Sequence, residues 1–65
     1  MGSRVTFGSE LRRLRTEAGL TQAQVAELVG RDPNTIARWE RGELLPGPLV
    51  QEGVLARLCE RQTAD

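Results

Sequence analysis

The residues of this sequence best suited to specific recognition are an asparagine and an arginine at helical spacing. Asn34 and Arg38 lie four positions apart, which places them on one face if the segment is helical. In the major groove of duplex DNA, asparagine can pair with N6 and N7 of adenine, and arginine with O6 and N7 of guanine. The spacing therefore favours contact with base edges, provided that a helix presents this face to solvent.

Residues for catalysis are sparse. The sequence has no histidine or tyrosine, and its one cysteine, Cys59, permits neither an internal disulfide nor a cysteine metal cluster. Metal-ligand and phosphate-loop spacings are missing. A catalytic site would consist of carboxylates alone, and four glutamates that we expect on outward faces show no convergence: Glu10, Glu17, Glu27 and Glu43. We therefore expect no enzymatic activity, no metal and no cofactor.

Overall charge does not favour a nucleic-acid partner. Nine acidic residues balance nine basic ones, whereas nucleic-acid binders usually carry basic excess. All the basic residues are arginines, the side chain best suited to bidentate contact with phosphate or guanine. Because the sequence lacks a long apolar run and has a single cysteine, we expect a cytoplasmic protein without membrane contact. If it binds DNA, it would be associated with the nucleoid.

Glycines and prolines divide the 65 residues into helical segments, and no segment has the alternating pattern of a strand. We expect an all-α fold in one domain over residues 1–65, with helices at about residues 7–18, 21–29, 33–41 and 48–62. A domain of this size buries only ~60% of the surface that its unfolded chain exposes, so its core should be thin.

Capping residues mark the starts of three of these helices. Thr6 is the expected N-cap of the first helix, and Thr21 with Gln24 forms a capping box for the second. Asp32 followed by Pro33 is typical of an N-cap and first helical residue, and starts the third. Only about three residues separate the second and third helices, as a helix-turn-helix requires.

The third helix has two different sides. Counting about 100° per residue places Ile36, Trp39 and Glu40 on an inward side, and Asn34 and Arg38 on an outward side. Trp39 has two interpretations, a core residue or a stacking platform for bases. The core is favoured, because single-strand binders normally need several stacking aromatics. For an isolated helix, an outward polar face that is merely solvated is an ordinary alternative.

The segments LTQAQVAELVG at residues 20–30 and TIARWERG at residues 35–42 closely resemble the lambda-repressor and Cro-like (XRE-type) helix-turn-helix family. The similarity covers about residues 7–58, and the combined pattern is more specific than a single short motif. The resemblance implies a compact domain of four or five helices that binds double-stranded DNA sequence-specifically. It also implies a regulator of transcription, foremost a repressor.

The resemblance also assigns roles to individual residues. It implies base reading by Asn34, Thr35 and Arg38, and contacts with the DNA backbone by Gln22, Arg31 and Arg41. Pro33 departs from the family, which often has a polar base-reading side chain there, so base reading should shift towards Asn34 and Arg38. Arg15 matches the arginine that pairs with the glutamate of the WE motif, here Glu40. The alternative is two unrelated surface charges. Arg4 should fray, with an arm contact to the DNA backbone as the alternative.

The last predicted helix has an unusually broad apolar face. We expect that face both to cover the core and to form a two-fold dimer seam, through Val50, Val54, Leu55, Leu58 and Cys59. Such a homodimer would place two recognition helices ~34 Å apart on a roughly palindromic site. The family usually adds a fifth helix after the fourth. We expect either that the last helix here takes the place of both, or that this is a trimmed or minimal member of the family.

A protein-interaction module is the alternative function, because a helix-turn-helix fold does not by itself fix what is bound. The family includes toxin-neutralising antitoxins and transcriptional bridging factors, whose partners are a toxin or the transcription machinery. The balanced charge and the broad apolar face of the last helix favour this alternative.

Overall fold

The computed structural model describes residues 6–63, without the side chains of residues 62 and 63, and this range contains four α-helices and no strand. The helices are α1 (Phe7–Glu17), α2 (Gln22–Val29), α3 (Pro33–Arg41) and α4 (Pro48–Thr63). Compared with the expected bounds, α1 ends one residue earlier, α2 begins one residue later and α4 ends one residue later. The expectation for Arg4 lies outside the described residues.

Reciprocal hydrogen bonds begin the first two helices. At α2, the Gln24 N–H donates to Thr21 Oγ1 over 3.1 Å, and the Thr21 N–H donates to Gln24 Oε1 over 2.8 Å. This is the predicted capping box. At α1, Thr6 is the expected N-cap, and Ser9 completes a second capping box that was not predicted.

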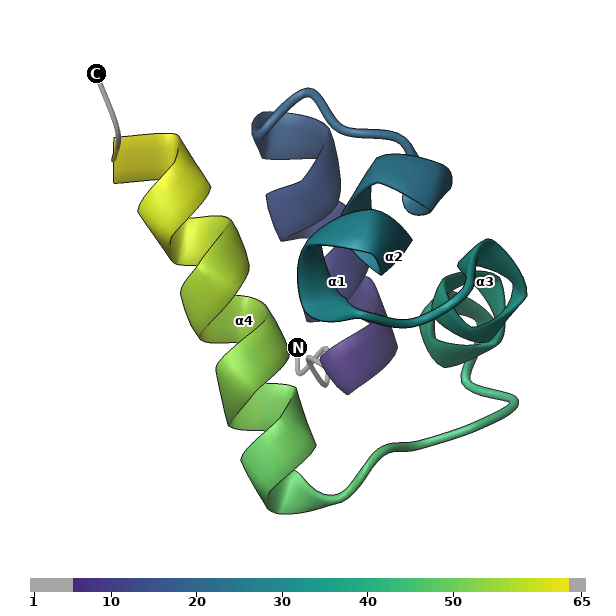
Figure 1. Cartoon of the computed structure of the whole chain (residues 1–65). Helices are drawn as coiled ribbons and strands as arrows, with labels where there is room; N and C mark the ends of the chain where they lie inside the picture. Colours follow the sequence, from purple (N-terminus) through teal and green to yellow (C-terminus); the bar gives the residue numbers. More distant parts are fainter. Residues whose placement is uncertain (1–5, 64–65) are drawn as a thin grey trace, which may run out of the picture.

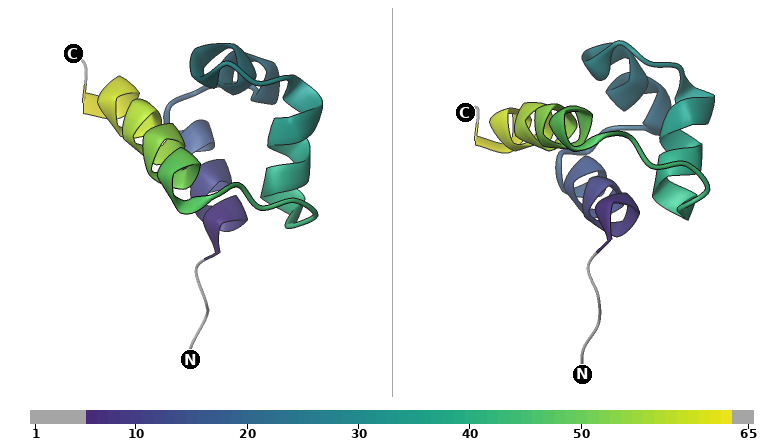
Figure 2. Two further views of the ribbon diagram at one scale, coloured as in Figure 1. Left: turned by 60° about the horizontal axis from the view of Figure 1, so that its bottom comes forward. Right: turned by 90° about the horizontal axis from the view of Figure 1, so that it is seen from below.

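The recognition-helix candidate α3 and the long helix α4 lie on opposite sides of the molecule, with α1 and α2 between them (Figure 1). Both α3 and α4 contact α1 and α2. Two further views show the extended connection that crosses from the end of α3 to the start of α4 (Figure 2). One side of α3 therefore faces the domain and the other faces away from it.

All four helices contribute side chains to one core. Its buried residues are Phe7, Leu11, Leu14, Val25, Ala26, Ile36, Trp39, Val54 and Leu58. Trp39 is 3% exposed, and its ring meets that of Phe7 edge to face with the centroids 5.8 Å apart. The interpretation of Trp39 as a core residue is therefore confirmed, and it is not an exposed platform for bases.

Helix α4 covers the core, as expected, but two of the five residues predicted to form a dimer seam are buried and leave almost no surface for a second copy to contact. Val54 is 4% exposed and Leu58 is 0% exposed, because both pack inside the chain's own core. Val50 and Leu55 are partly buried against that core, and only Cys59 is exposed. A dimer seam on this helix would thus be narrower than the sequence predicted.

The start of α1 lies close to the end of α3. A Cβ atom added at Gly8 would lie 2.8 Å from the backbone oxygen of Glu40 and would collide with that of Trp39. Real Cβ atoms essentially never come this close, so glycine at this position allows the two backbones to meet. This contact sets the position of α3 relative to α1.

Among the described residues, no helix has both the length and the apolar character that crossing a membrane requires.

Candidate nucleic-acid interface

The turn between α2 and α3 is built from three residues. Gly30 ends α2 in the left-handed conformation, with φ at +76°, and the Arg31 N–H donates to the Ala26 carbonyl over 2.8 Å. Asp32 then caps α3, because its Oδ1 accepts a 2.7 Å hydrogen bond from the Thr35 N–H. This bond to the ionised carboxylate holds the pKa of Asp32 below its usual range.

Helix α3 has the two sides that the sequence predicted. Ile36 and Trp39 are buried against α1 and α2, whereas Asn34 and Arg38 are exposed. Thr35 is partly buried, and Arg41 is exposed at the end of the helix. The outward edge that carries Asn34 and Arg38 is therefore accessible on a helix whose opposite side anchors it in the core.

One carboxylate joins the three helices of the interface. Glu40 Oε2 lies 2.6 Å from Arg15 Nε of α1, and Glu40 Oε1 lies 3.2 Å from Arg15 Nη2. Arg15 Nη1 also donates to the Leu20 carbonyl over 3.1 Å. The ion pair that the resemblance implied is thus present. Side-chain exposure of only 15% for Arg15 and 5% for Glu40 makes it a partly buried pair.

Gln22, the first residue of α2, belongs to the same network. Its Nε2 donates to Glu40 Oε1 over 3.1 Å, and the residue is partly buried. The resemblance implied a contact of Gln22 with the DNA backbone, and this bond to Glu40 was not predicted. A phosphate contact there stays a prediction that would use the second amide hydrogen or the exposed N–H groups at the start of α2.

The other arginines assigned to the DNA backbone lie at the two ends of α3. The guanidinium carbon of Arg31 lies 6.0 Å from the centroid of the Trp39 ring, close enough for a cation–π contact. At the far end, Arg41 Nε lies 2.8 Å from Glu43 Oε2. The two arginines expected to contact the DNA backbone are therefore separated along α3, one on each side of Asn34 and Arg38.

Glu43 is exposed, as expected, but its pairing with Arg41 and Arg38 was not predicted. Its hydrogen bonds from Arg41 hold the pKa of the carboxyl below its usual range, and they raise the pKa of Arg41. Its other oxygen, Oε1, lies 3.9 Å from Arg38 Nε. A signal was present, because a residue just past a helix-ending glycine lies beside the last turn of that helix.

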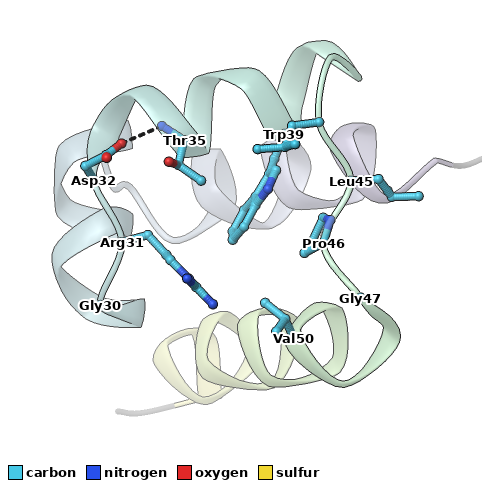
Figure 3. A pocket seen from close by; sticks show the side chains of 10 residues that line it. Gly30, Arg31, Asp32, Thr35, Trp39, Leu45, Pro46, Gly47 and Val50 are labelled. Carbon is cyan, nitrogen blue, oxygen red and sulfur yellow. Dashed lines mark hydrogen bonds between the residues drawn. The ribbon is translucent and has the colours of Figure 1, made fainter.

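An open groove of about 540 Å³ lies beside α3, and the α2–α3 turn, the α3–α4 connection and the start of α4 line the rest of it. The side chains of Arg31, Trp39 and Val50 face this groove (Figure 3). Asn34 and Arg38 are not among its lining residues, so the groove and the polar edge are separate features.

Within residues 6–63, no group of three or more histidine, cysteine, aspartate or glutamate side chains is placed to hold a metal ion.

Comparison with known families agrees with this geometry. A family model described as a helix-turn-helix domain matches residues 6–64, which include all four helices. Neither a search of curated proteins nor a search of solved structures gives a match. The match spans nearly the whole sequence, and its central part is the capped pair α2 and α3 joined by a three-residue turn. The chain therefore belongs to the helix-turn-helix domain family, as its resemblance to lambda-repressor and Cro-like proteins indicated.

Proposed function

We propose that this protein binds double-stranded DNA sequence-specifically by placing α3 in the major groove, and that it represses transcription. The observation that carries the proposal is the exposed edge with Asn34 and Arg38 on a helix held by the core on its other side. The nine residues of α3 make a rod about 13 Å long, and the major groove admits an α-helix.

The positions of the two base-reading candidates suit this docking. Asn34 is the second residue of α3 and Arg38 lies about one turn further on. In helix-turn-helix docking, the N-terminal residues of the recognition helix contact base edges. Asn34 would read adenine and Arg38 guanine, with Thr35 as a minor contributor because it is partly buried.

Contacts to the sugar-phosphate backbone would fix the position of α3 in the groove. Arg31 and Arg41 lie beside its two ends, and Gln22 opens α2, where unpaired N–H groups and the positive end of the helix dipole favour a phosphate. Because these contacts are independent of sequence, they would set affinity and salt dependence, while Asn34 and Arg38 would set specificity.

Selection of bound sequences from a pool of random duplex DNA tests this proposal. We expect enrichment of a short motif that contains both adenine and guanine, and an affinity that falls linearly with the logarithm of salt concentration. A protein that retains all duplexes equally across the salt range, or retains none, contradicts sequence-specific binding.

Two copies per site are part of the proposal. In a homodimer on DNA the enriched motif should be roughly palindromic, with half-sites about one helical turn, ~34 Å, apart. Sedimentation of the protein alone and on the enriched duplex measures the number of copies. One copy in both cases would restrict the proposal to a monomer that reads a single half-site.

A protein-interaction module, such as an antitoxin or a transcriptional bridging factor, is the second candidate. Three leucines close together in the sequence around the α3–α4 connection favour it, with exposed fractions of 40% at Leu44, 69% at Leu45 and 84% at Leu49. Large apolar side chains exposed to solvent can serve as protein contacts. Absence of any enriched duplex, even at low salt, would favour this candidate over DNA binding.

A further inference from the structure

Glu43 lies between the two arginines of α3 to which we assign DNA contacts. Its Oε2 lies 2.8 Å from Arg41 Nε, and its Oε1 accepts from Arg41 Nη2 over 3.2 Å. The same Oε1 lies 3.9 Å from Arg38 Nε, within reach as an ion pair but beyond hydrogen-bond distance. All three side chains are about half exposed.

The end of α3 fixes the backbone of Glu43. The Glu43 N–H donates to the Arg38 carbonyl over 2.9 Å, and the Gly42 N–H donates to the Trp39 carbonyl over 3.2 Å. Gly42 makes this ending possible because its φ is +79°. The carboxylate therefore stays beside the last turn of the helix, on the side of Arg38 and Arg41.

Local stability gives little reason for an acidic residue here. A helix C-terminus carries partial negative charge, which disfavours a carboxylate. Exposed ion pairs contribute little to folding because water and salt screen them. Glu43 also opposes any phosphate that approaches Arg41. Its position thus bears more on what the arginines bind than on the fold.

We propose that Glu43 is a positioning residue that gives Arg38 its preference for guanine over phosphate; this rests on the proposed DNA-binding function. The carboxylate lies at the Nε side of Arg38, which leaves both terminal amino groups to face guanine O6 and N7. These acceptors carry no net charge, whereas a phosphate is an anion that Glu43 repels. The pairing therefore penalises sequence-independent contacts more than base contacts.

Two duplexes test this inference: the one most enriched in the selection and a shuffled duplex of the same length. The Kd of each is measured over a series of salt concentrations for the wild type and Glu43→Gln. We expect the variant to bind the shuffled duplex about 3-fold more tightly than the wild type does, and to bind the enriched duplex with a Kd within about 2-fold of the wild-type value. Both changes are small because an exposed ion pair has a small interaction energy. The salt slope for the shuffled duplex should steepen by up to ~0.9.

Three further variants separate positioning from a general effect of charge. Glu17→Gln removes the same charge from an exposed ion pair with Arg13 on α1, and it should leave the ratio of the two Kd values unchanged. Glu43→Asp should keep most of the ratio. In an Arg38→Ala background, Glu43→Gln should no longer alter the ratio, because the residue through which Glu43 acts is gone.

Each outcome has a distinct consequence. Suppose that the wild type selects a motif. If Glu43→Gln then has the same ratio of Kd values for the two duplexes as the wild type, or if Glu17→Gln lowers that ratio as much as Glu43→Gln does, this inference is wrong and the proposed function stands. An unchanged effect of Glu43→Gln in the Arg38→Ala background overturns the route through Arg38. A wild type that enriches no duplex overturns the proposed function and this inference with it.

Discussion

Arg15 of α1 and Glu40 of α3 form a partly buried ion pair through two separate nitrogen–oxygen contacts, of 2.6 and 3.2 Å. Because Gln22 of α2 donates to the same carboxylate, the pair connects the three helices that position the outward edge of α3. Replacement of either charged partner leaves the other without its counter-charge in a poorly solvated place, which is more costly than loss of a surface pair.

We expect Glu40→Ala to lower the free energy of unfolding by about 3 kcal/mol, because Arg15 is left unpaired and partly buried. Urea denaturation followed by circular dichroism measures this change. Glu17→Ala is the matched control: its pair with Arg13 is exposed, and such pairs contribute about 0–1 kcal/mol. If the first variant is too unstable to measure, Glu40→Gln, which keeps the shape of the side chain, should show a smaller loss. Equal stability of the two alanine variants contradicts a structural role for the pair.

Two glycines in helices should respond oppositely to the same substitution. At Gly8 the added methyl group meets backbone oxygens of α3, so Gly8→Ala should destabilise the fold by about 1–3 kcal/mol through overpacking. At Gly53, in the interior of α4, the added methyl group meets nothing within 4 Å, so Gly53→Ala should stabilise it by up to ~1 kcal/mol. Thermal and urea denaturation of both variants measure the signs. Stabilisation by Gly8→Ala would contradict the close approach of α1 to α3.

The acid sensitivity of the fold should include a contribution from the cap of α3. The Thr35 N–H bond lowers the folded pKa of Asp32, so the cap stabilises the fold above the ordinary pKa of aspartate. That contribution disappears as the pH falls through the lowered pKa. Asp32→Asn keeps a capping oxygen that does not titrate. Relative to this variant, the wild type should lose stability as the pH falls through that range, which denaturation at a series of pH values measures. Parallel pH profiles of the two proteins would show that Asp32 has no lowered pKa.

Short-range features of the fold could be predicted from the sequence. The Thr21 and Gln24 capping box and the Asp32 cap depend on residues three positions apart, so their chemistry is visible in the order of the residues. The inward direction of Ile36 and Trp39 follows from helical periodicity alone. These local rules suffice to place the Asn34 and Arg38 edge on the outside of the domain.

Features that depend on distances between helices could not be predicted in this way. The need for glycine at residue 8 arises from backbone oxygens more than thirty positions further along the chain. The bond from Gln22 to Glu40 likewise depends on how α2 meets α3. The apolar face of α4 was predicted both to cover the core and to form a dimer seam, because periodicity does not show that Val54 and Leu58 are buried in the core. The sequence also gave no reason to single out Leu45 and Leu49.

The two exposed arginines of α3 should affect DNA binding in different ways. Arg38→Ala should cost ~1–3 kcal/mol on the enriched duplex and relax the preference at one base position, because a bidentate contact to a base edge is lost. Arg41→Ala should weaken binding to all duplexes alike and reduce the salt slope by about 1, because a phosphate contact is lost. Repetition of the selection with each variant, together with salt titrations, separates the two effects. Arg12→Ala on the exposed surface of α1 serves as the control for loss of one positive charge. If Arg38→Ala weakens every duplex equally, as Arg41→Ala should, then Arg38 contacts the DNA backbone, and the base-reading role assigned to Arg38 is wrong.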